Sequence, residues 1–314
     1  MMMPAPFPFG LRMRTALLHA VWLASLGLVI LLQPQPAAAA SAGPRVIPAP
    51  AASSTSELAA WCARLAPRLL RVTREQCVAS GLSATGAASA RRVPILGRRF
   101  PANASTGRPL SILLVGGIHG DELTSTAVVF EWMQLLARAP RQPYQWMMVP
   151  LLNPDGMLAR QPTRVNANGV DLNRNFPTPG WKDEAPAWWI NKTRRDPRRY
   201  PGRAPLSEPE SRWLHAEIER ARPDLVVAVH APYGLLDFDG PAPPPKRFGN
   251  LRIDRVGVFP GSLGNYGGLH KNVPVITIEL AHARKMPSPD ETRRIWEDMH
   301  RWIEKNLAHT VSAL

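Results

Sequence analysis

The stretch Ser111-Ile-Leu-Leu-Val-Gly-Gly-Ile-His-Gly-Asp-Glu122 decides the fold of this chain. An apolar run ends in two glycines, and His119 and Glu122 follow three residues apart. A short run that is apolar on both faces is typical of a buried strand in a parallel sheet. Ligands of parallel α/β sheets gather beyond the carboxyl ends of the strands. We therefore expect a functional site where this strand ends.

Three further apolar runs follow at residues 146–152, 224–230 and 275–280, separated by helical patterns. Residues 122–137 predict one helix. Ser207-Glu-Pro-Glu210 has the spacing of a capping box and predicts a second helix that runs to about residue 222. An apolar stripe at 295–303 predicts a final helix. The order predicts an α/β fold with helices on both sides of a mixed, mostly parallel central sheet.

The first 40 residues have the layout of a secretory signal, with Arg12 and Arg14 before an apolar stretch and a small-residue run that ends at Ala40. We expect cleavage there and a periplasmic or secreted protein. The apolar stretch is also barely long enough to span a bilayer, so a membrane-anchored protein that faces the periplasm stays open. Residues 41–55 are rich in Ala, Pro and Ser and predict a linker.

Cys62 and Cys77 are the only cysteines. On one helix they would lie about 22 Å apart at ~1.5 Å per residue, which is beyond bonding reach. Pro67 and a capping box over residues 73–76 instead indicate two short helices with a bend. Export favours a disulfide over two core thiols. We expect a helical hairpin over residues 56–88, followed by a catalytic domain over residues 89–314.

The composition of the 314 residues, 45% hydrophobic and 20% charged, excludes disorder of the whole chain. The formal net charge is +14, and removal of residues 1–40, which hold two arginines and no acids, leaves +12. Such a field favours anionic partners, and association with a membrane or envelope surface fits it. No nucleic-acid motif is present, and we expect no nucleic-acid partner. The oligomeric state stays unknown.

His119, Glu122 and His230 together predict a site for one zinc ion per chain. Catalytic zinc takes three protein ligands from imidazole nitrogen and carboxylate oxygen and leaves a position open for water. His230 ends another predicted strand, so all three residues lie at one edge of the sheet. The spacing is His-x-x-Glu rather than His-Glu-x-x-His, which makes Glu122 a ligand. The general base must therefore come from elsewhere.

Glu279 is the candidate base, because a carboxylate inside an apolar strand is costly to bury without a purpose. It would take a proton from water and return it to a leaving amine; the alternative is a salt-bridged glutamate at a strand end. Arg164 is a candidate for stabilising the oxyanion at the attacked carbonyl. Arg174 with Asn173 would grip a substrate carboxylate, since a guanidinium binds carboxylates bidentately.

Two long segments have the composition of loops. Residues 177–206 are proline-rich and basic and carry three tryptophans, Trp181, Trp188 and Trp189. They form either a surface excursion packed by its own aromatic rings or a wall of the substrate cleft. Residues 235–251 are similar and carry Asp237 and Asp239.

These motifs resemble the zinc carboxypeptidase superfamily and, within it, the murein tripeptide amidase branch. The likeness covers roughly residues 96–307, and His₂Glu is the known ligand set of carboxypeptidase A. The motifs that carry it are His-Gly-Asp-Glu122, Asn-Pro-Asp-Gly156, Asp-Leu-Asn-Arg-Asn-Phe176, Ser-Glu-Pro-Glu210, His230-Ala-Pro and Ile-Glu-Leu280. The resemblance implies the same roles for the three ligands, for the base and for residues 164, 173 and 174. Tyr266, at the end of Pro-Gly-Ser-Leu-Gly-Asn-Tyr, is a further candidate for substrate binding.

The resemblance implies an exported, exo-acting zinc amidopeptidase or carboxypeptidase. Its substrate would be a cell-wall peptide, cut at the γ-D-glutamyl–meso-diaminopimelate bond, or another peptide with a free terminal carboxylate. Asp237 or Asp239 would bind the diaminopimelate ammonium. Two alternatives stay open: an N-acyl amino acid deacylase of the aspartoacylase or succinylglutamate desuccinylase type, and a wall-peptide binding protein without catalysis.

Overall fold

A computed structural model describes residues 55–104 and 107–307 of the chain. Its centre is a nine-stranded sheet of order β1-β2-β4-β3-β5-β9-β6-β8-β7. The strands are β1 (Ser83–Ala88), β2 (Pro94–Phe100), β3 (Ser111–Val115), β4 (Gln145–Val149), β5 (Leu225–His230), β6 (Leu235–Asp239), β7 (Arg247–Phe248), β8 (Leu251–Ile253) and β9 (Val275–Glu279). The central strands β4, β3, β5 and β9 run parallel, as do β6 and β8, and the other pairs are antiparallel. A mixed sheet is thus confirmed, although parallel pairs do not outnumber antiparallel ones.

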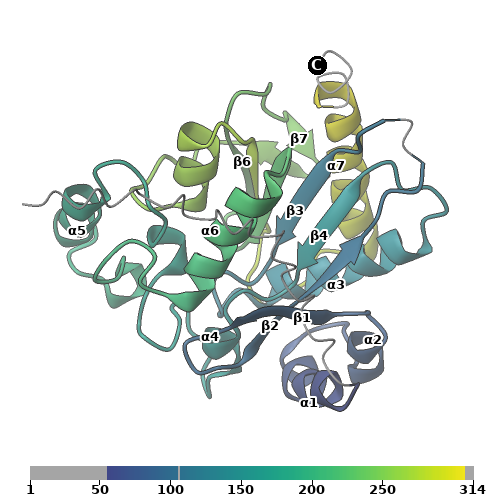
Figure 1. Cartoon of the computed structure of the whole chain (residues 1–314), viewed down its shortest axis with the longest axis horizontal. Helices are drawn as coiled ribbons and strands as arrows, with labels where there is room; N and C mark the ends of the chain where they lie inside the picture. The colour runs from purple at the N-terminus through teal and green to yellow at the C-terminus, as the bar shows by residue number, and fades with distance from the viewer. Residues whose placement is uncertain (1–54, 105–106, 308–314) are drawn as a thin grey trace, which may run out of the picture. The chain divides into compact units, whose positions relative to one another are not determined.

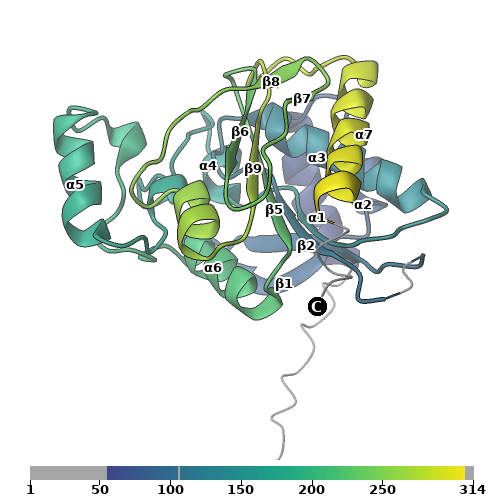
Figure 2. The same cartoon turned by 90° about the horizontal axis from the view of Figure 1, so that it is seen from above.

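Helices cover both faces of this sheet. The α-helices are α1 (Thr55–Leu65), α2 (Arg74–Val78), α3 (Leu123–Arg138), α4 (Pro154–Leu158), α5 (Trp181–Asn191), α6 (Pro209–Ala221) and α7 (Pro289–Asn306). Short turns of other helix types are η1 (Ala66–Arg68), η2 (Leu172–Arg174), η3 (Pro197–Arg199) and the π-helical η4 (Asn265–His270). Figure 2 shows α3 and α7 on one face and α6 on the other. In the part of the chain that the structure describes, no helix is both long and apolar enough to cross a membrane.

Strand β3 shows why its sequence reads as apolar on both faces. Ile112 and Leu114 pack into the core that contains residues of α3 and α7, whereas Leu113 and Val115 pack into the core that contains residues of α6. Side chains alternate between the two faces of a strand, so a central strand covered on both sides needs apolar residues at every position. Polar residues therefore lie at the ends of the central strands, as His230 does in β5 and Glu279 in β9.

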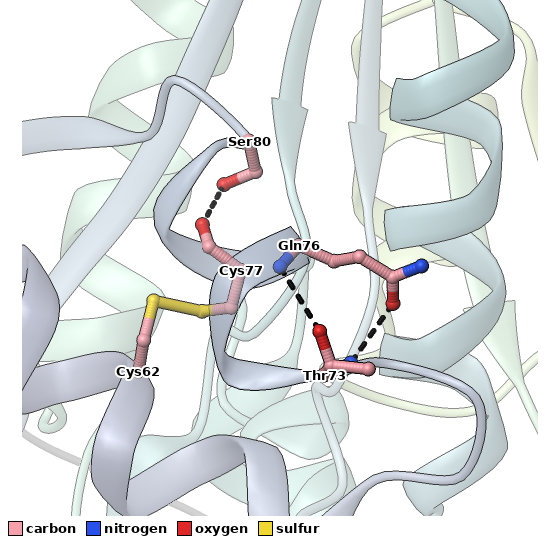
Figure 3. The surroundings of a disulfide bond; sticks show 5 residues. All are labelled: Cys62, Thr73, Gln76, Cys77 and Ser80. Carbon is pink, nitrogen blue, oxygen red and sulfur yellow. Dashed lines mark hydrogen bonds between the residues drawn. A yellow bond between two sulfur atoms is a disulfide. The ribbon is translucent and has the colours of Figure 1, made fainter.

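The expected pair of short N-terminal helices is present, joined by a disulfide between Cys62 and Cys77 (Figure 3). The capping box is also present, because Thr73 Oγ1 accepts from the Gln76 N–H and Gln76 Oε1 accepts from the Thr73 N–H. The helices end at Val78. Residues 83–88, which the sequence analysis includes in the hairpin, form strand β1 and pair with β2 at the edge of the sheet (Figure 1).

The capping box predicted at the start of α6 is wrong. The N-cap of α6 is Glu208, and its side chain makes no cap bond. Glu210, the residue expected to close the box, instead accepts from the Ala90 N–H and from Asn166 Nδ2. Partners distant in the sequence thus replace the local bond that the spacing predicts.

The two segments predicted as long loops contain regular structure. Residues 177–206 include α5 and η3, and α5 lies at the edge of the molecule away from α3 and α7 in both views (Figures 1 and 2). Residues 235–251 include β6 and β7, and β6 pairs with β9. The predicted signal, residues 1–40, and residues 41–54 of the predicted linker lie outside the described residues, whereas Thr55, the last residue of that linker, begins α1.

The disulfide is expected to contribute to stability. It closes a loop of 15 residues, and a loop of that length gives about 3 kcal/mol in the chain-entropy treatment. Replacing both Cys62 and Cys77 by alanine should therefore lower the free energy of unfolding by about 3 kcal/mol, measured by urea titration followed by tryptophan fluorescence. Reduced wild-type protein should match the variant. An unchanged midpoint would show that packing alone holds the hairpin.

Candidate functional site

The turn after β3 depends on glycine at two positions. Gly117 has φ +57°, and a Cβ there would lie 2.6 Å from Thr126 Oγ1. A Cβ on Gly120 would lie 2.3 Å from the backbone of Gly156 at α4. Only glycine fits such a close approach at a left-handed φ, or backbone against backbone. The tight turn brings His119 and Glu122 back over the end of the sheet, just before α3 begins.

His119, Glu122 and His230 meet there and are almost fully buried. His119 Nδ1 lies 2.7 Å from Glu122 Oε1, and His230 Nδ1 lies 3.0 Å from Glu122 Oε2. The two Nδ1 atoms are 3.1 Å apart. Burial by itself would raise the pKa of Glu122, but the two imidazoles that face its oxygens hold that pKa below the ordinary value. The glutamate is therefore an ionised carboxylate.

Asp171 contacts both His119 and Arg164 and fixes their side chains, although no role was predicted for it from the sequence. Its carboxylate is fully buried; Oδ1 lies 3.1 Å from His119 Nε2, and Oδ2 accepts from Arg164 Nε at 3.0 Å. Arg164 also reaches Glu122 Oε1 at 3.4 Å. In the tautomer in which Nε2–H donates to this carboxylate, Nδ1 is the nitrogen with the free lone pair. The one sequence signal was its place in the Asp-Leu-Asn-Arg run, between two candidate arginines.

The three convergent residues fit a zinc ion by the chemistry of their atoms. Two imidazole nitrogens and a carboxylate turned toward one another form a donor set that a cation satisfies and that zinc prefers in catalytic sites. A histidine ligand that gives its other N–H to a carboxylate is the usual supporting arrangement. The ligand atoms of the three residues all lie within 4.8 Å of one another. Among the described residues, this is the one group of three or more His, Cys, Asp or Glu side chains that could hold a metal ion.

Glu279 lies beside this group because of strand register. Residues His230 of β5 and Glu279 of β9 are paired across parallel strands. The Glu279 side chain is only 7% exposed, and its Oε2 has no hydrogen-bond partner among the described residues. Burial raises the pKa of Glu279, although His230 opposes the shift. A buried carboxylate with an unused oxygen beside a cation site is placed to exchange a proton with a ligand.

A cleft in two halves surrounds the group. The basic half has a volume of about 640 Å³ and the mixed-charge half about 280 Å³. The first is lined by Glu122, and the second by His119 and Glu279. Arg164 and two further residues line both halves. The residues shared by both halves are Arg164, Arg199 and Tyr233.

Arg174 and Asn173 line the mixed-charge half. The guanidinium of Arg174 lies 4.4 Å from the centre of the Phe259 ring and 5.1 Å from that of Trp188. Burial lowers the pKa of Arg174 to about 10, which leaves the group charged at neutral pH. Its Nε has no partner among the described residues. Trp181 donates its Nε1–H to the Arg174 carbonyl at 2.8 Å and so fixes the backbone there.

Asp237 and Asp239 lie on the same face of the sheet as Glu279. In the antiparallel β6–β9 pair, Asp237 is opposite Thr277 and Asp239 is opposite Val275, and alternate residues of a strand share one face. Both aspartates line the mixed-charge half. Burial raises the pKa of Asp237, and burial together with Asp237 raises the pKa of Asp239 to about 6. No cation is paired with Asp239 in the described part of the chain.

Tyr266, which was expected to bind the substrate, does not line the cleft. Its ring is buried and stacks on Phe176 at 5.7 Å, and its hydroxyl donates to Glu219 on α6. The residue therefore belongs to the core beneath α6 and lines neither half of the cleft. Tyr233, which the sequence analysis did not single out, lines both halves and is 53% exposed. Tyr233 directly follows the quoted His230-Ala-Pro motif, and that position was its one sequence signal.

Comparisons with known proteins give a family and several relatives. Residues 84–236 match the family model described as zinc carboxypeptidase. Murein peptide amidase A of Escherichia coli K12 is 36% identical over 140 residues, which cover 44% of this chain and 55% of that protein. The protein of that name from Vibrio campbellii is 35% identical over 175 residues, which cover 54% of this chain and 68% of that protein. The match thus spans about half the length of the Escherichia coli relative.

A solved structure shows that the fold is shared. Bovine thrombin-activatable fibrinolysis inhibitor, in complex with tick carboxypeptidase inhibitor, aligns with a TM-score of 0.55. The alignment covers 84% of this chain and 98% of the other at 17% identity.

Asp171→Asn should weaken zinc binding by about 10–100-fold, the usual effect of losing a supporting carboxylate behind a histidine ligand. The amide can offer its NH₂ to His119, which would favour the wrong tautomer. Competition with a fluorescent chelator measures the affinity without any substrate. Asp224→Asn, which removes a carboxylate bound to Arg108 far along the chain, is the control and should bind zinc as the wild type does. Equal affinity in both variants would contradict the role of Asp171.

Proposed function

The chain belongs to the zinc carboxypeptidase family of metallopeptidases, and from that premise we propose that it is a zinc-dependent amidopeptidase of cell-wall peptides. The bond cut is the γ-D-glutamyl–meso-diaminopimelate amide. One observation carries the proposal: a donor set for zinc lies at one cleft with a buried carboxylate whose Oε2 has no partner and a buried guanidinium whose Nε has none among the described residues. The two murein peptide amidases of about 35% identity support the choice of substrate.

His119, Glu122 and His230 would hold the zinc ion, which supplies Lewis acidity that activates water at neutral pH and polarises a carbonyl. Glu279 accepts a proton as water attacks the scissile carbonyl. The same carboxyl then gives a proton to the leaving nitrogen as the amide bond breaks. Arg164, fixed by Asp171, donates to the oxygen on which negative charge develops.

Arg174 and Asn173 would bind the terminal carboxylate of the leaving residue. The guanidinium lies against two aromatic rings, and its Nη1 donates to the Asn173 carbonyl at 2.6 Å. Its Nε has no partner among the described residues, so the guanidinium can still donate to a substrate carboxylate. Leu263 donates its N–H to Asn173 Oδ1 at 2.8 Å and so orients that amide. A clamp that binds a terminal carboxylate would make the enzyme exo-acting.

Asp237 and Asp239 would bind the second ammonium group of diaminopimelate. Both line the half of the cleft that holds Arg174, so a leaving residue with its carboxylate on Arg174 extends its side chain along β6. Burial and, after it, the charge of Asp237 raise the pKa of Asp239, so an ionised pair is costly in this partly buried site. An ammonium group placed between them removes that cost.

Export of the protein is part of the proposal. Disulfides form and persist in oxidising compartments, and the bond between Cys62 and Cys77 supports a periplasmic or secreted location.

Purified protein should release diaminopimelate from L-Ala-γ-D-Glu-meso-diaminopimelate, detected by mass spectrometry, and a chelator should abolish the release. Glu279→Gln should lower kcat by at least about 100-fold while zinc stays bound, because general-base catalysis typically contributes that much. Release of diaminopimelate by the variant at the wild-type rate would remove Glu279 from the mechanism. Zinc binding without release from this peptide would contradict the proposed substrate and favour a small-molecule deacylase.

Asp239→Asn should remove a pH dependence of specificity. Asp239 is protonated below its pKa of about 6 and ionised above it, so attraction for an ammonium group appears as pH rises. We expect wild-type preference for diaminopimelate over 2-aminopimelate, which lacks the distal ammonium, to rise about tenfold from about pH 5 to about pH 7. The ratio of kcat/KM for the two substrates is measured, so titrations common to both cancel. The control variant Asp254→Asn should show the same rise in preference as the wild type. If the rise persists in Asp239→Asn, Asp239 does not bind the ammonium group.

A further inference from the structure

The basic half of the cleft carries positive charge that its own acids do not neutralise. One of its two acids is engaged by the histidines of the metal centre, and the other, Asp121, bonds Arg198 at 2.8 Å. Arg199, Arg284 and Lys285 also line this half. None of the three side chains has a carboxylate partner within residues 55–104 and 107–307. The Arg199 guanidinium donates to the Tyr233 hydroxyl, at 3.4 Å.

Arg199 projects from a turn that is tied to the metal centre. The turn η3 is capped by Asp196, whose Oδ1 accepts from the Arg198 N–H at 2.9 Å. The Arg198–Asp121 ion pair joins η3 to the residue directly before the ligand Glu122. The backbone that carries Arg199 is therefore anchored beside the metal ligands, although it is far from His119 and Glu122 in the sequence.

Arg284 and Lys285 come from a second segment, which is tied to the same place. Thr124, in the first turn of α3, donates its hydroxyl to the His282 carbonyl at 2.7 Å. The Thr124 N–H donates to the Ala283 carbonyl at 3.1 Å. Two backbone carbonyls just before Arg284 are thus anchored two residues from the ligand Glu122. Two unrelated segments bring cations to one cavity, and each is anchored beside the metal ligands.

We infer that the basic half is a subsite for a carboxylate carried by the acyl residue, on the other side of the scissile amide from Arg174. The inference rests on the proposed function, in which the mixed-charge half takes the leaving residue. A cleft lined by several like charges focuses its field on an oppositely charged ligand, and guanidinium groups match carboxylate geometry. In the proposed substrate this ligand is the free α-carboxylate of the γ-linked D-glutamyl residue. The volume of about 640 Å³ leaves room for a further residue beyond it.

The test compares L-Ala-γ-D-Glu-meso-diaminopimelate with the same peptide in which the glutamyl α-carboxylate is an amide. We expect the wild type to prefer the carboxylate by about tenfold in kcat/KM, the effect of one charge-assisted hydrogen bond. The double variant Arg284→Ala/Lys285→Ala should cleave the two peptides at similar rates. Arg203→Ala is the matched control, because Arg203 is an exposed arginine of the same basic segment as Arg199 that lines neither half of the cleft, and it should keep the preference.

A binding measurement separates failure of this inference from failure of the proposed function. Calorimetry compares L-Ala-D-Glu with L-alanyl-D-isoglutamine, which lacks the α-carboxylate, on the zinc-loaded wild type and the double variant. Tighter binding of L-Ala-D-Glu that is lost in the double variant supports the subsite even if no tripeptide is cleaved. Equal binding of the two compounds to the wild type overturns it, as does a preference that the double variant retains. Absence of tripeptide cleavage counts against the proposed substrate alone.

Discussion

The buried carboxylate of Asp171 is the group on which the rest of the site depends. A charge removed from water must have partners, and Asp171 has them on both sides, in His119 and Arg164. Both partners reach Glu122, so one network of buried charges contains two predicted ligands and the arginine at the attacked carbonyl. Removal of a single member would leave the others buried without compensation. The network therefore behaves as one unit rather than as separate side chains.

Asp171 also positions Asn173 and Arg174, the proposed clamp for a substrate carboxylate. Its Oδ1 accepts from the N–H of Asn173 at 3.0 Å and caps the turn η2. That turn sets the position of Arg174, whose guanidinium then lies between Phe259 and Trp188. A predicted metal ligand, the arginine proposed for the oxyanion and the proposed carboxylate clamp are thus placed by one acid. The last two fall within residues 164–174, whereas His119 comes from the distant turn after β3.

The cleft gains its asymmetry from segments outside this network. Of the two interpretations of residues 177–206, both hold for different parts: Trp189 packs on Tyr200 within the segment, whereas Trp188 and Arg199 form walls of the cleft. One half offers Arg174 opposite a pair of aspartates, and the other offers cations alone. A substrate with a carboxylate on each side of the scissile amide and an ammonium at one end matches this distribution of charge. Electrostatic matching of this kind selects among substrates more than it adds affinity.

The sequence by itself determined the four central strands β3, β4, β5 and β9, helices α3, α6 and α7, and the residues that converge at the edge of the sheet. Apolar runs of strand length, helical periodicity and the His-x-x-Glu spacing are local patterns, and the strands, α3 and α7 follow them closely. The pairing of Cys62 with Cys77 likewise followed from a bend within a few residues. Such local patterns do not predict interactions between distant segments. Glu210, for example, accepts hydrogen bonds from the Ala90 N–H and from Asn166 Nδ2 instead of capping α6.

Only the tertiary structure decided which side chains share a cavity. Tyr266 was near the base in sequence, yet packing turned it into the core beneath α6. Asp171 stood in a quoted motif without a role until its two partners were seen. Arg284 and Lys285 carried no pattern at all, and the anchor of their segment on Thr124 brought them to the site. The physical reason is that charge and hydrogen-bond partners are chosen by distance in space, whereas sequence periodicity reports only which face of one element is buried.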